Sequence, residues 1–170
     1  MSRLSRPSHA LVTGGGRGIG RAVAAALTEA GASVTILGRN RATLDDAVDS
    51  GAARFAAVAD VADQASVSAA VAEAARRQPI DILVANAGIN IRKTPELLDL
   101  KEWQTVVDTN LTGPFLACKA CYPAMKAAGG GKIIVIGSMS SIFGLPFAPA
   151  YSATKGGIVQ MARAMATAWA

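Results

Sequence analysis

Short apolar runs alternate along the chain with longer segments in which apolar residues recur every three or four positions. The short runs are rich in β-branched residues, which is typical of buried strands, and the longer segments are rich in Ala and amphipathic, which is typical of helices. This alternation predicts an α/β domain built on a parallel sheet. The predicted strands are 9–13, 33–37, 55–58, 80–85 and 132–136. The predicted helices are 19–30, 41–50, 63–77, 101–127 and 151–170.

Glycine and proline mark the ends of these segments. Gly31 lies just past the first predicted helix, and Pro79 stops the third. The long helical region 101–127 is interrupted at 110–114, and three glycines at 129–131 separate it from the last strand. The sequence contains no repeat and no low-complexity linker, so residues 1–170 are predicted to form a single domain.

Composition narrows the function classes. The chain has 170 residues, of which 51% are hydrophobic and 17% charged, and its formal net charge is +5, so it is predicted to be globular. No apolar run reaches the roughly 18 residues of a membrane span, and the N-terminus lacks the apolar core of a signal peptide, which favours the cytoplasm. Lys and Arg are scattered and accompanied by few aromatic residues, which argues against nucleic-acid binding. A basic cleft for a phosphorylated cofactor explains part of the excess charge.

The two cysteines, Cys118 and Cys121, form a C-x-x-C pattern inside a predicted helix. Such a pair can be half of a metal or redox site, but the sequence has no second pair and its lone His9 is far away. Packing on one helix face is the favoured reading, and no metal is expected.

A glycine-rich loop joins the first strand to the first helix. It reads TGGGRGIG over 13–20, at a place where a helix N-terminus can receive a pyrophosphate. Glycines there let the backbone approach the phosphates closely and adopt positive φ. The loop residues expected to bind a nucleotide cofactor are Gly14, Gly16, Arg17, Gly18, Ile19 and Gly20.

Cofactor choice is expected to depend on the end of the second strand, where an acid would bond an adenosine ribose diol. No acid stands there; Arg39 follows instead, and Arg17 adds a second cation. Two guanidinium groups suit a 2′-phosphate, which favours NADP(H), with NAD(H) as the alternative. Both could also be ordinary solvated arginines.

Two further turns are predicted to border the cofactor. Asp60 and Val61 follow the third strand, where they could bond the adenine ring. Asn86, Ala87 and Gly88 follow the fourth strand and form a small, close-packing turn, in which Asn86 could tie neighbouring strands together.

Tyr151 and Lys155 carry the candidate chemistry. On a helix they are spaced i and i+4 and so share a face, where the ammonium would favour the phenolate. A phenol poised in this way can exchange a proton with a carbonyl or carbinol oxygen. Ser138 would end a strand and present its hydroxyl to the same oxygen; Ser140 and Ser141 are rivals with a less favourable spacing. Alone, a Tyr-x-x-x-Lys pattern is more often an ordinary helix surface.

Taken together, these features closely resemble the short-chain dehydrogenase/reductase family in its single-domain form. The match covers nearly the whole chain and includes the motifs TGGGRGIG, Asp60-Val61, ANAG at 85–88, DTNLTG at 108–113, Ser138 and YSATK at 151–155. The one departure is Ala85, where the family more often has a second Asn.

The resemblance implies a Rossmann-type, doubly wound parallel sheet with strand order 3-2-1-4-5. It also implies an oxidoreductase that passes a hydride between NADP(H) and a ketone or secondary alcohol. In that reading Tyr151 is the general acid–base, Lys155 favours its ionised form and bonds the nicotinamide ribose, and Ser138 polarises the carbonyl. Asn110 would kink its helix and hold a water that joins Lys155 to solvent.

The substrate is less well specified. Residues 89–100 and 140–149 should flank the pocket, with Asn90, Arg92 and Lys93 among mostly apolar neighbours that are at least as well explained by loop packing. The region resembles sugar-acid and polyol dehydrogenases of the family as well as its oxoacyl reductases.

Family members normally continue through two more strands and a substrate lid, so the chain is expected to be incomplete at its C-terminus, with an open strand edge at 133–136. The full-length form is expected to be a homodimer or homotetramer. The alternative function is a nucleotide-binding module without turnover; a sugar-nucleotide epimerase or dehydratase would need a different glycine spacing.

Overall fold

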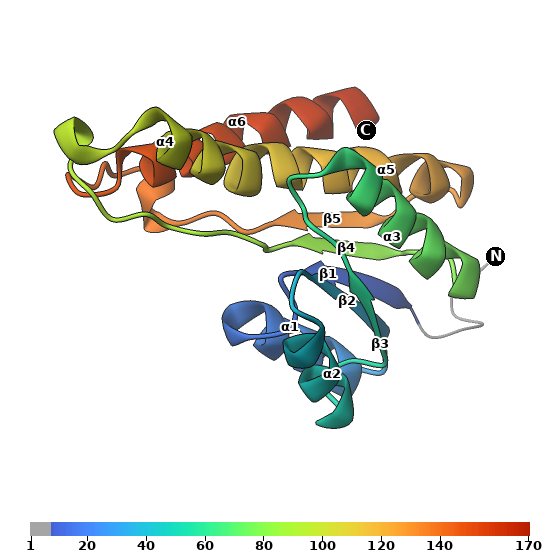
Figure 1. The fold of residues 1–170 in the computed structure, drawn as a ribbon. Helices are drawn as coiled ribbons and strands as arrows, with labels where there is room; N and C mark the ends of the chain where they lie inside the picture. The colour runs from blue at the N-terminus through green and yellow to red at the C-terminus, as the bar shows by residue number, and fades with distance from the viewer. Residues whose placement is uncertain (1–7) are drawn as a thin grey trace.

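The computed structural model describes residues 8–170 and contains one parallel five-stranded sheet with helices on both faces (Figure 1). The strands are β1 His9–Thr13, β2 Ser33–Gly38, β3 Phe55–Val58, β4 Ile82–Ala85 and β5 Lys132–Val135. Their order is β3-β2-β1-β4-β5, which confirms the predicted Rossmann-type sheet and its strand order. Residues 1–7, on which part of the signal-peptide expectation depends, lie outside the described residues.

The principal helices are α1 Gly18–Glu29, α2 Arg41–Asp49, α3 Gln64–Arg77, α4 Leu100–Val107, α5 Gly113–Ala127 and α6 Pro149–Trp169. Their ends, and those of the strands, lie within two residues of the predicted ones. The predicted interruption at 110–114 is a π-helical turn, η2 Asp108–Thr112, so the chain passes from α4 to α5 without leaving helical geometry. Two short 3₁₀ turns were not predicted, η1 Pro95–Leu97 and η3 Met139–Ser141.

Helix starts differ in a way that bears on the site. Asn40, Asp63 and Asp99 each accept a hydrogen bond from a first-turn N–H of α2, α3 and α4 respectively. Arg17, which precedes α1, provides no side-chain cap, and the first turn of α1 carries no acid. The first N–H groups of α1 therefore remain available to an anion.

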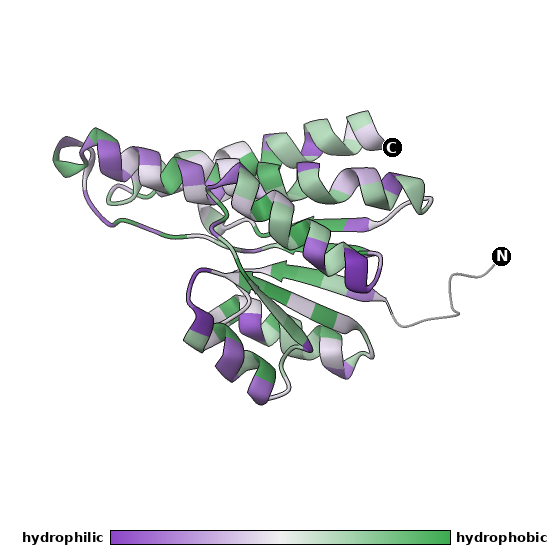
Figure 2. Ribbon diagram, turned by 45° about the vertical axis from the view of Figure 1, so that its right-hand side comes forward, coloured by the Kyte–Doolittle hydropathy of each residue, from purple (hydrophilic) through white to green (hydrophobic). Residues whose placement is uncertain are grey.

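Alternation along the strands divides the core between the two faces of the sheet. In β1, Leu11 packs into the cluster under α3, α5 and α6, whereas Ala10 and Val12 pack into the cluster against α1 and α2. Figure 1 shows these helix sets on opposite sides of the sheet, and Figure 2 shows that the strands are largely hydrophobic. Because all five strands are parallel, their carboxyl ends lie together at one edge of the sheet, between the two layers of helices.

Cys118 and Cys121 are free and fully buried in the cluster under α5. Burial raises the pKa of Cys118 to about 11 and, together with the neighbouring Cys118, raises the pKa of Cys121 to about 12. Both thiols therefore stay protonated near neutral pH, in agreement with the predicted packing role.

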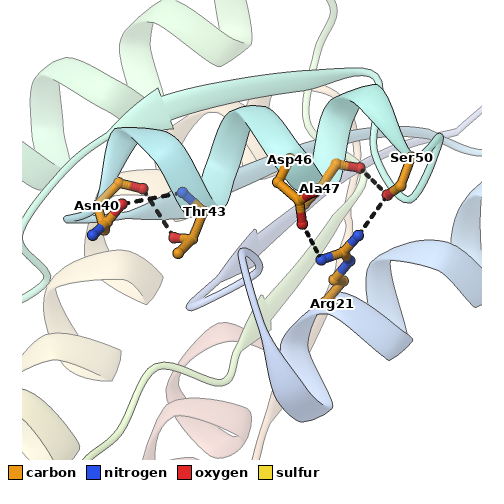
Figure 3. A network of polar contacts seen from close by, with 6 residues as sticks. All are labelled: Arg21, Asn40, Thr43, Asp46, Ala47 and Ser50. Atoms are coloured by element: carbon orange, nitrogen blue, oxygen red, sulfur yellow. Dashed lines mark hydrogen bonds and ion pairs between the residues drawn. The ribbon is translucent and has the colours of Figure 1, made fainter.

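An ion pair joins the two helices on one face of the sheet. Arg21 of α1 reaches Asp46 at 2.5 Å and donates to Ser50 Oγ at 2.9 Å, at the far end of α2 (Figure 3). At the near end of α2, Asn40 Oδ1 accepts from the N–H of Thr43 at 3.1 Å. The pair is exposed, so its contribution is alignment of α2 more than stability.

The strand β5 forms one edge of the sheet and pairs only with β4 among the described residues. Its side chains alternate between exposed and half-buried, and Ile134 is 48% exposed. Within residues 8–170, no helix is both long and apolar enough to cross a membrane.

Candidate active site

A cavity of about 720 Å³ opens at the carboxyl ends of the strands. Every strand contributes the residue that directly follows it: Gly14, Arg39, Ala59, Asn86 and Ile136. This is the crevice in which open parallel sheets bind their ligands. All the predicted cofactor residues line it, namely Gly14, Gly16, Arg17, Gly18, Ile19, Gly20, Arg39, Asp60, Val61, Asn86, Ala87, Gly88, Tyr151 and Lys155.

The glycine loop is shaped for close packing and for an anion. A Cβ on Gly20 would lie 2.2 Å from the carbonyl oxygen of Gly14 and 2.5 Å from Asn86 Nδ2, so no larger residue fits without backbone movement. Gly14 and Gly18 have φ of +67° and +53°. The uncapped first turn of α1 directly follows. Uncapped N–H groups beside a glycine loop suit the pyrophosphate of a dinucleotide.

Thr13 ties the turns after β1 and β4 together and was not among the predicted site residues. Its hydroxyl oxygen accepts from the N–H groups of Asn86 and Ala87, each at 3.0 Å. Asn86 Nδ2 donates to the carbonyl of Thr13 at 3.0 Å. These contacts fix the width of the crevice at its centre, and the position of Thr13 directly before the glycine loop is the sequence signal that could have identified it.

The end of the cavity near β2 carries both predicted cations. Arg17 and Arg39 line it, and the guanidinium of Arg39 lies 3.8 Å from the exposed carboxylate of Asp60. Asn40 and Thr43, which were not predicted, line the same end. This end of the cavity has a net positive charge, because two guanidinium groups face a single carboxylate, and a hydroxyl adds a hydrogen-bonding group. These properties fit a phosphate ester.

Tyr151 and Lys155 line the opposite end, one turn apart on α6. The Lys155 ammonium lies 5.8 Å from the centre of the Tyr151 ring and donates to the carbonyl of Ile136 at 2.5 Å. Burial lowers the pKa of Lys155, and no carboxylate among residues 8–170 pairs with it. The phenolic oxygen of Tyr151 makes no hydrogen bond to any residue in the same range, so it is open to a ligand.

Ser138 does not line this cavity. It caps η3, where its hydroxyl oxygen accepts from the N–H of Ser140 at 3.1 Å and its own N–H donates to Ser141 Oγ at 3.1 Å. The η3 turn that follows Ser138 packs against α6, the helix that carries Tyr151. Of the two rival serines, Ser140 is buried and Ser141 is engaged by Ser138.

Asn110 lies in the π turn, is fully buried and does not line the cavity. Its Oδ1 accepts from the N–H of Ile89 and its Nδ2 donates to the carbonyl of Ile89, both at 2.8 Å. Nδ2 also lies 3.4 Å from the hydroxyl of Thr154, the neighbour of Lys155. Asn110 thus connects the chain after β4 to α6, and Ile89 is itself a lining residue.

Residues 8–170 match the sequence model of a family described as "short chain dehydrogenase". The chain is 41% identical over 165 residues to galactitol 2-dehydrogenase (L-tagatose-forming) from Cereibacter sphaeroides, and 40% identical over 167 residues to gluconate 5-dehydrogenase from Gluconobacter oxydans (strain 621H). Each match covers 95% of this chain, which spans about 65% of the length of either relative.

The fold is similar to a solved structure with a known ligand set. A gluconate 5-dehydrogenase from Burkholderia cenocepacia J2315, in complex with NADP and tartrate, superposes with a TM-score of 0.89 at 39% identity. The superposition covers 96% of this chain and 66% of that one.

Proposed function

The chain belongs to the short-chain dehydrogenase family, and from that premise we propose that it is an oxidoreductase acting on a ketone or secondary alcohol with NADP(H). The observation that carries this proposal is that Tyr151 and Lys155 line the same cavity as the uncapped glycine loop. The phenol proposed to exchange the proton thus shares a crevice with the loop proposed to bind the dinucleotide.

When bound, NADP(H) supplies or accepts the hydride. Tyr151 gives a proton to the carbonyl oxygen as the ketone is reduced and takes it back in the reverse direction. The Lys155 ammonium, held by Ile136, favours the ionised phenol between the two transfers. Ser138 lies outside the cavity lining but directly follows the lining residue Gly137, and its hydroxyl, which only accepts from Ser140, is proposed to donate to the same substrate oxygen.

In this proposal Asn110 acts by position. Its hydrogen bonds to Ile89 hold the wall of the cavity against the π turn. Asn110 is also proposed to hold a water that joins Lys155 to solvent, as the family resemblance implies.

For the cofactor, we propose NADP(H) over NAD(H). The pair of guanidinium groups at the β2 end supports this choice, as does the NADP complex of the Burkholderia relative. For the substrate, we propose a sugar acid or a polyol, which the names of the gluconate and galactitol dehydrogenases support.

The proposal extends to a cytoplasmic location and to a homodimer or homotetramer built on α4, α5 and α6. Phe115 on α5 is 41% exposed, which supports burial of that face against a second copy. Sedimentation analysis of the purified protein tests the assembly; a monomer at micromolar concentration would contradict it.

The experiment that tests the function measures the absorbance of the reduced nicotinamide with NADP⁺ or NADPH and a panel of sugar acids, polyols and their ketones. We expect turnover that is faster with NADP(H) than with NAD(H). Cofactor binding without turnover on any panel member would favour a nucleotide-binding module instead.

A further inference from the structure

A cation and an aromatic ring meet where two loops approach each other beside the cavity. Asn90 lines the cavity, and Arg92 follows it by two residues; Phe147 precedes the lining residue Tyr151 by four. The guanidinium carbon of Arg92 lies 4.3 Å from the centre of the Phe147 ring. This contact links the loop after β4 to the loop before α6 and fixes the position of the cation between them.

The other charges of these loops are already engaged. Lys93 pairs with Glu102 at 2.5 Å, Glu96 accepts from the Thr94 hydroxyl at 2.6 Å, and Asp99 caps α4. The residues at 138–149 include no charged side chain. Among residues 8–170, no carboxylate lies within ion-pair distance of Arg92, so its positive charge is not neutralised by the protein.

Arg92 is exposed, and within residues 8–170 its N–H donors make no hydrogen bond or ion pair, so they are free for a ligand. A guanidinium that stacks on a ring uses its π face, while its N–H donors lie in the plane and point away from the ring. Those donors match a carboxylate in a two-pronged arrangement. Two extended residues span at most about 7 Å, so Arg92 is a short distance from the part of the cavity that Asn90 lines.

Resting on the proposed function, we infer that Arg92 binds a carboxylate of the substrate, so that the substrate class is a hydroxy acid rather than a neutral polyol. The acid group lies several bonds away from the carbon that changes oxidation state beside Tyr151. Phe147 holds the guanidinium in place and adds an apolar wall. Arg92 is thus a specificity-determining residue.

The test uses binding that requires no turnover. Protein saturated with NADPH is titrated by calorimetry with D-gluconate and with D-glucitol, which differ only in a carboxylate or a hydroxymethyl group at C1; L-threonate and L-threitol form a shorter pair. An alcohol cannot react with the reduced cofactor, so each Kd reports binding alone. We expect each acid to bind more tightly than its neutral partner.

Three variants and one control assign the effect. Arg92→Gln should raise the Kd of the acid roughly 10- to 100-fold, the range for a charge-assisted hydrogen bond, and leave the neutral partner unchanged. Arg92→Lys should give an intermediate loss, and Phe147→Leu a loss of roughly 2- to 5-fold. Lys93→Gln, which removes the adjacent cation that Glu102 already engages, should have no effect on the preference.

The outcomes separate this inference from the proposed function. The inference is overturned if neither acid binds more tightly than its neutral partner. It is also overturned if the preference for the acid persists in Arg92→Gln, or if Lys93→Gln removes the preference as completely as Arg92→Gln does. Turnover of the four alcohols is then measured with NADP⁺. A preference for acids that depends on Arg92, without any turnover, supports the carboxylate site and counts against the oxidoreductase proposal. Turnover without that preference supports the oxidoreductase proposal and counts against the carboxylate site.

Discussion

The side-chain amide of Asn110 exchanges two hydrogen bonds with the main chain of Ile89, both 2.8 Å long. Asn110 is fully buried, and the two residues are 21 positions apart in the sequence. One side chain therefore satisfies both the donor and the acceptor of a main-chain residue that lines the cavity.

Asn110→Ala should lower the free energy of unfolding by about 2 kcal/mol, because it leaves the N–H and the carbonyl of Ile89 without partners in a partly buried setting. Urea unfolding followed by circular dichroism measures the change. The control is Asn90→Ala, since Asn90 is exposed and should be replaceable at nearly no cost in stability. Equal stability of the two variants would show that the Asn110 contacts are not needed.

Tyr151→Phe should reduce kcat by about 100- to 10,000-fold, the range lost when a general acid–base is removed. Its affinity for NADPH should change by no more than about twofold, because that substitution removes only a hydroxyl. Tyr122→Phe is the matched control, since the Tyr122 ring stacks on Trp169 at 4.2 Å and does not line the cavity. Full activity in Tyr151→Phe would remove the phenol from the mechanism.

Lys155→Met should abolish most activity. It should also change how the stability of the ligand-free protein depends on pH. Burial lowers the pKa of Lys155 in the folded state, so the unfolded chain holds this proton more tightly. The cost of burying the ammonium is therefore complete below the lowered pKa, and the stability of the native chain rises as pH increases from there toward the ordinary lysine value.

Because methionine carries no such cost, the unfolding free energy of Lys155→Met minus that of the native chain should decrease as pH rises through this window. Urea unfolding at several alkaline pH values measures the difference. A difference that is constant or that grows with pH would contradict the assigned burial effect.

Arg39→Ala should raise the Kd for NADPH roughly 10-fold and leave the Kd for NADH within about twofold, because only the 2′-phosphate needs the guanidinium. Fluorescence titration of the reduced cofactors measures both. Arg41→Ala serves as the control, because Arg41 pairs with Asp45 at 3.8 Å on the surface of α2 and does not line the cavity. Equal losses for both cofactors in Arg39→Ala would count against a 2′-phosphate site.

Gly20→Ala should destabilise the protein by about 1 to 3 kcal/mol and abolish cofactor binding, because its Cβ would collide with the carbonyl of Gly14. Gly156→Ala is the contrasting substitution within α6, where a Cβ would meet nothing within 4 Å. It should stabilise the protein by up to about 1 kcal/mol, because alanine is the better helix former. Thermal unfolding of both variants checks the opposite signs.

The fold follows from the sequence because its signals are local and periodic. The short apolar run of β1, the glycine past α1 and the β-branched run of β2 each specify an element within a few residues, and a parallel sheet limits how such elements connect. The π turn was predicted only as an interruption of a helix. The DTNLTG segment ends in a glycine and is followed by a proline, and nothing in it indicates that the helix continues.

Only the site residues that belong to short sequence motifs could be predicted from the sequence. The glycine loop, Tyr151 and Lys155 belong to short segments with a recognisable spacing, and the cavity gathers them. Three contacts of the site join segments that no motif links: the carbonyl of Ile136 holds Lys155 of α6, the hydroxyl of Thr13 binds the turn after β4, and Arg39 after β2 contacts Asp60 after β3. Such contacts depend on the register of neighbouring strands, which no single segment encodes.

The π turn at 108–112 also sets a rule for how this part of the chain can vary in length. A π turn holds one residue more than an α-helix would use over the same rise. Deleting that residue would restore a regular α-helix of about the same rise and would leave the orientation of the helix after it nearly unchanged, because the wider turn rotates less per residue. The apolar stripe of α5 that includes Leu116 and Cys118 would therefore keep facing the sheet, and the main loss would be the displaced position of Asn110 within the turn. A one-residue change elsewhere in α4 or α5 would instead rotate that stripe by about 100°.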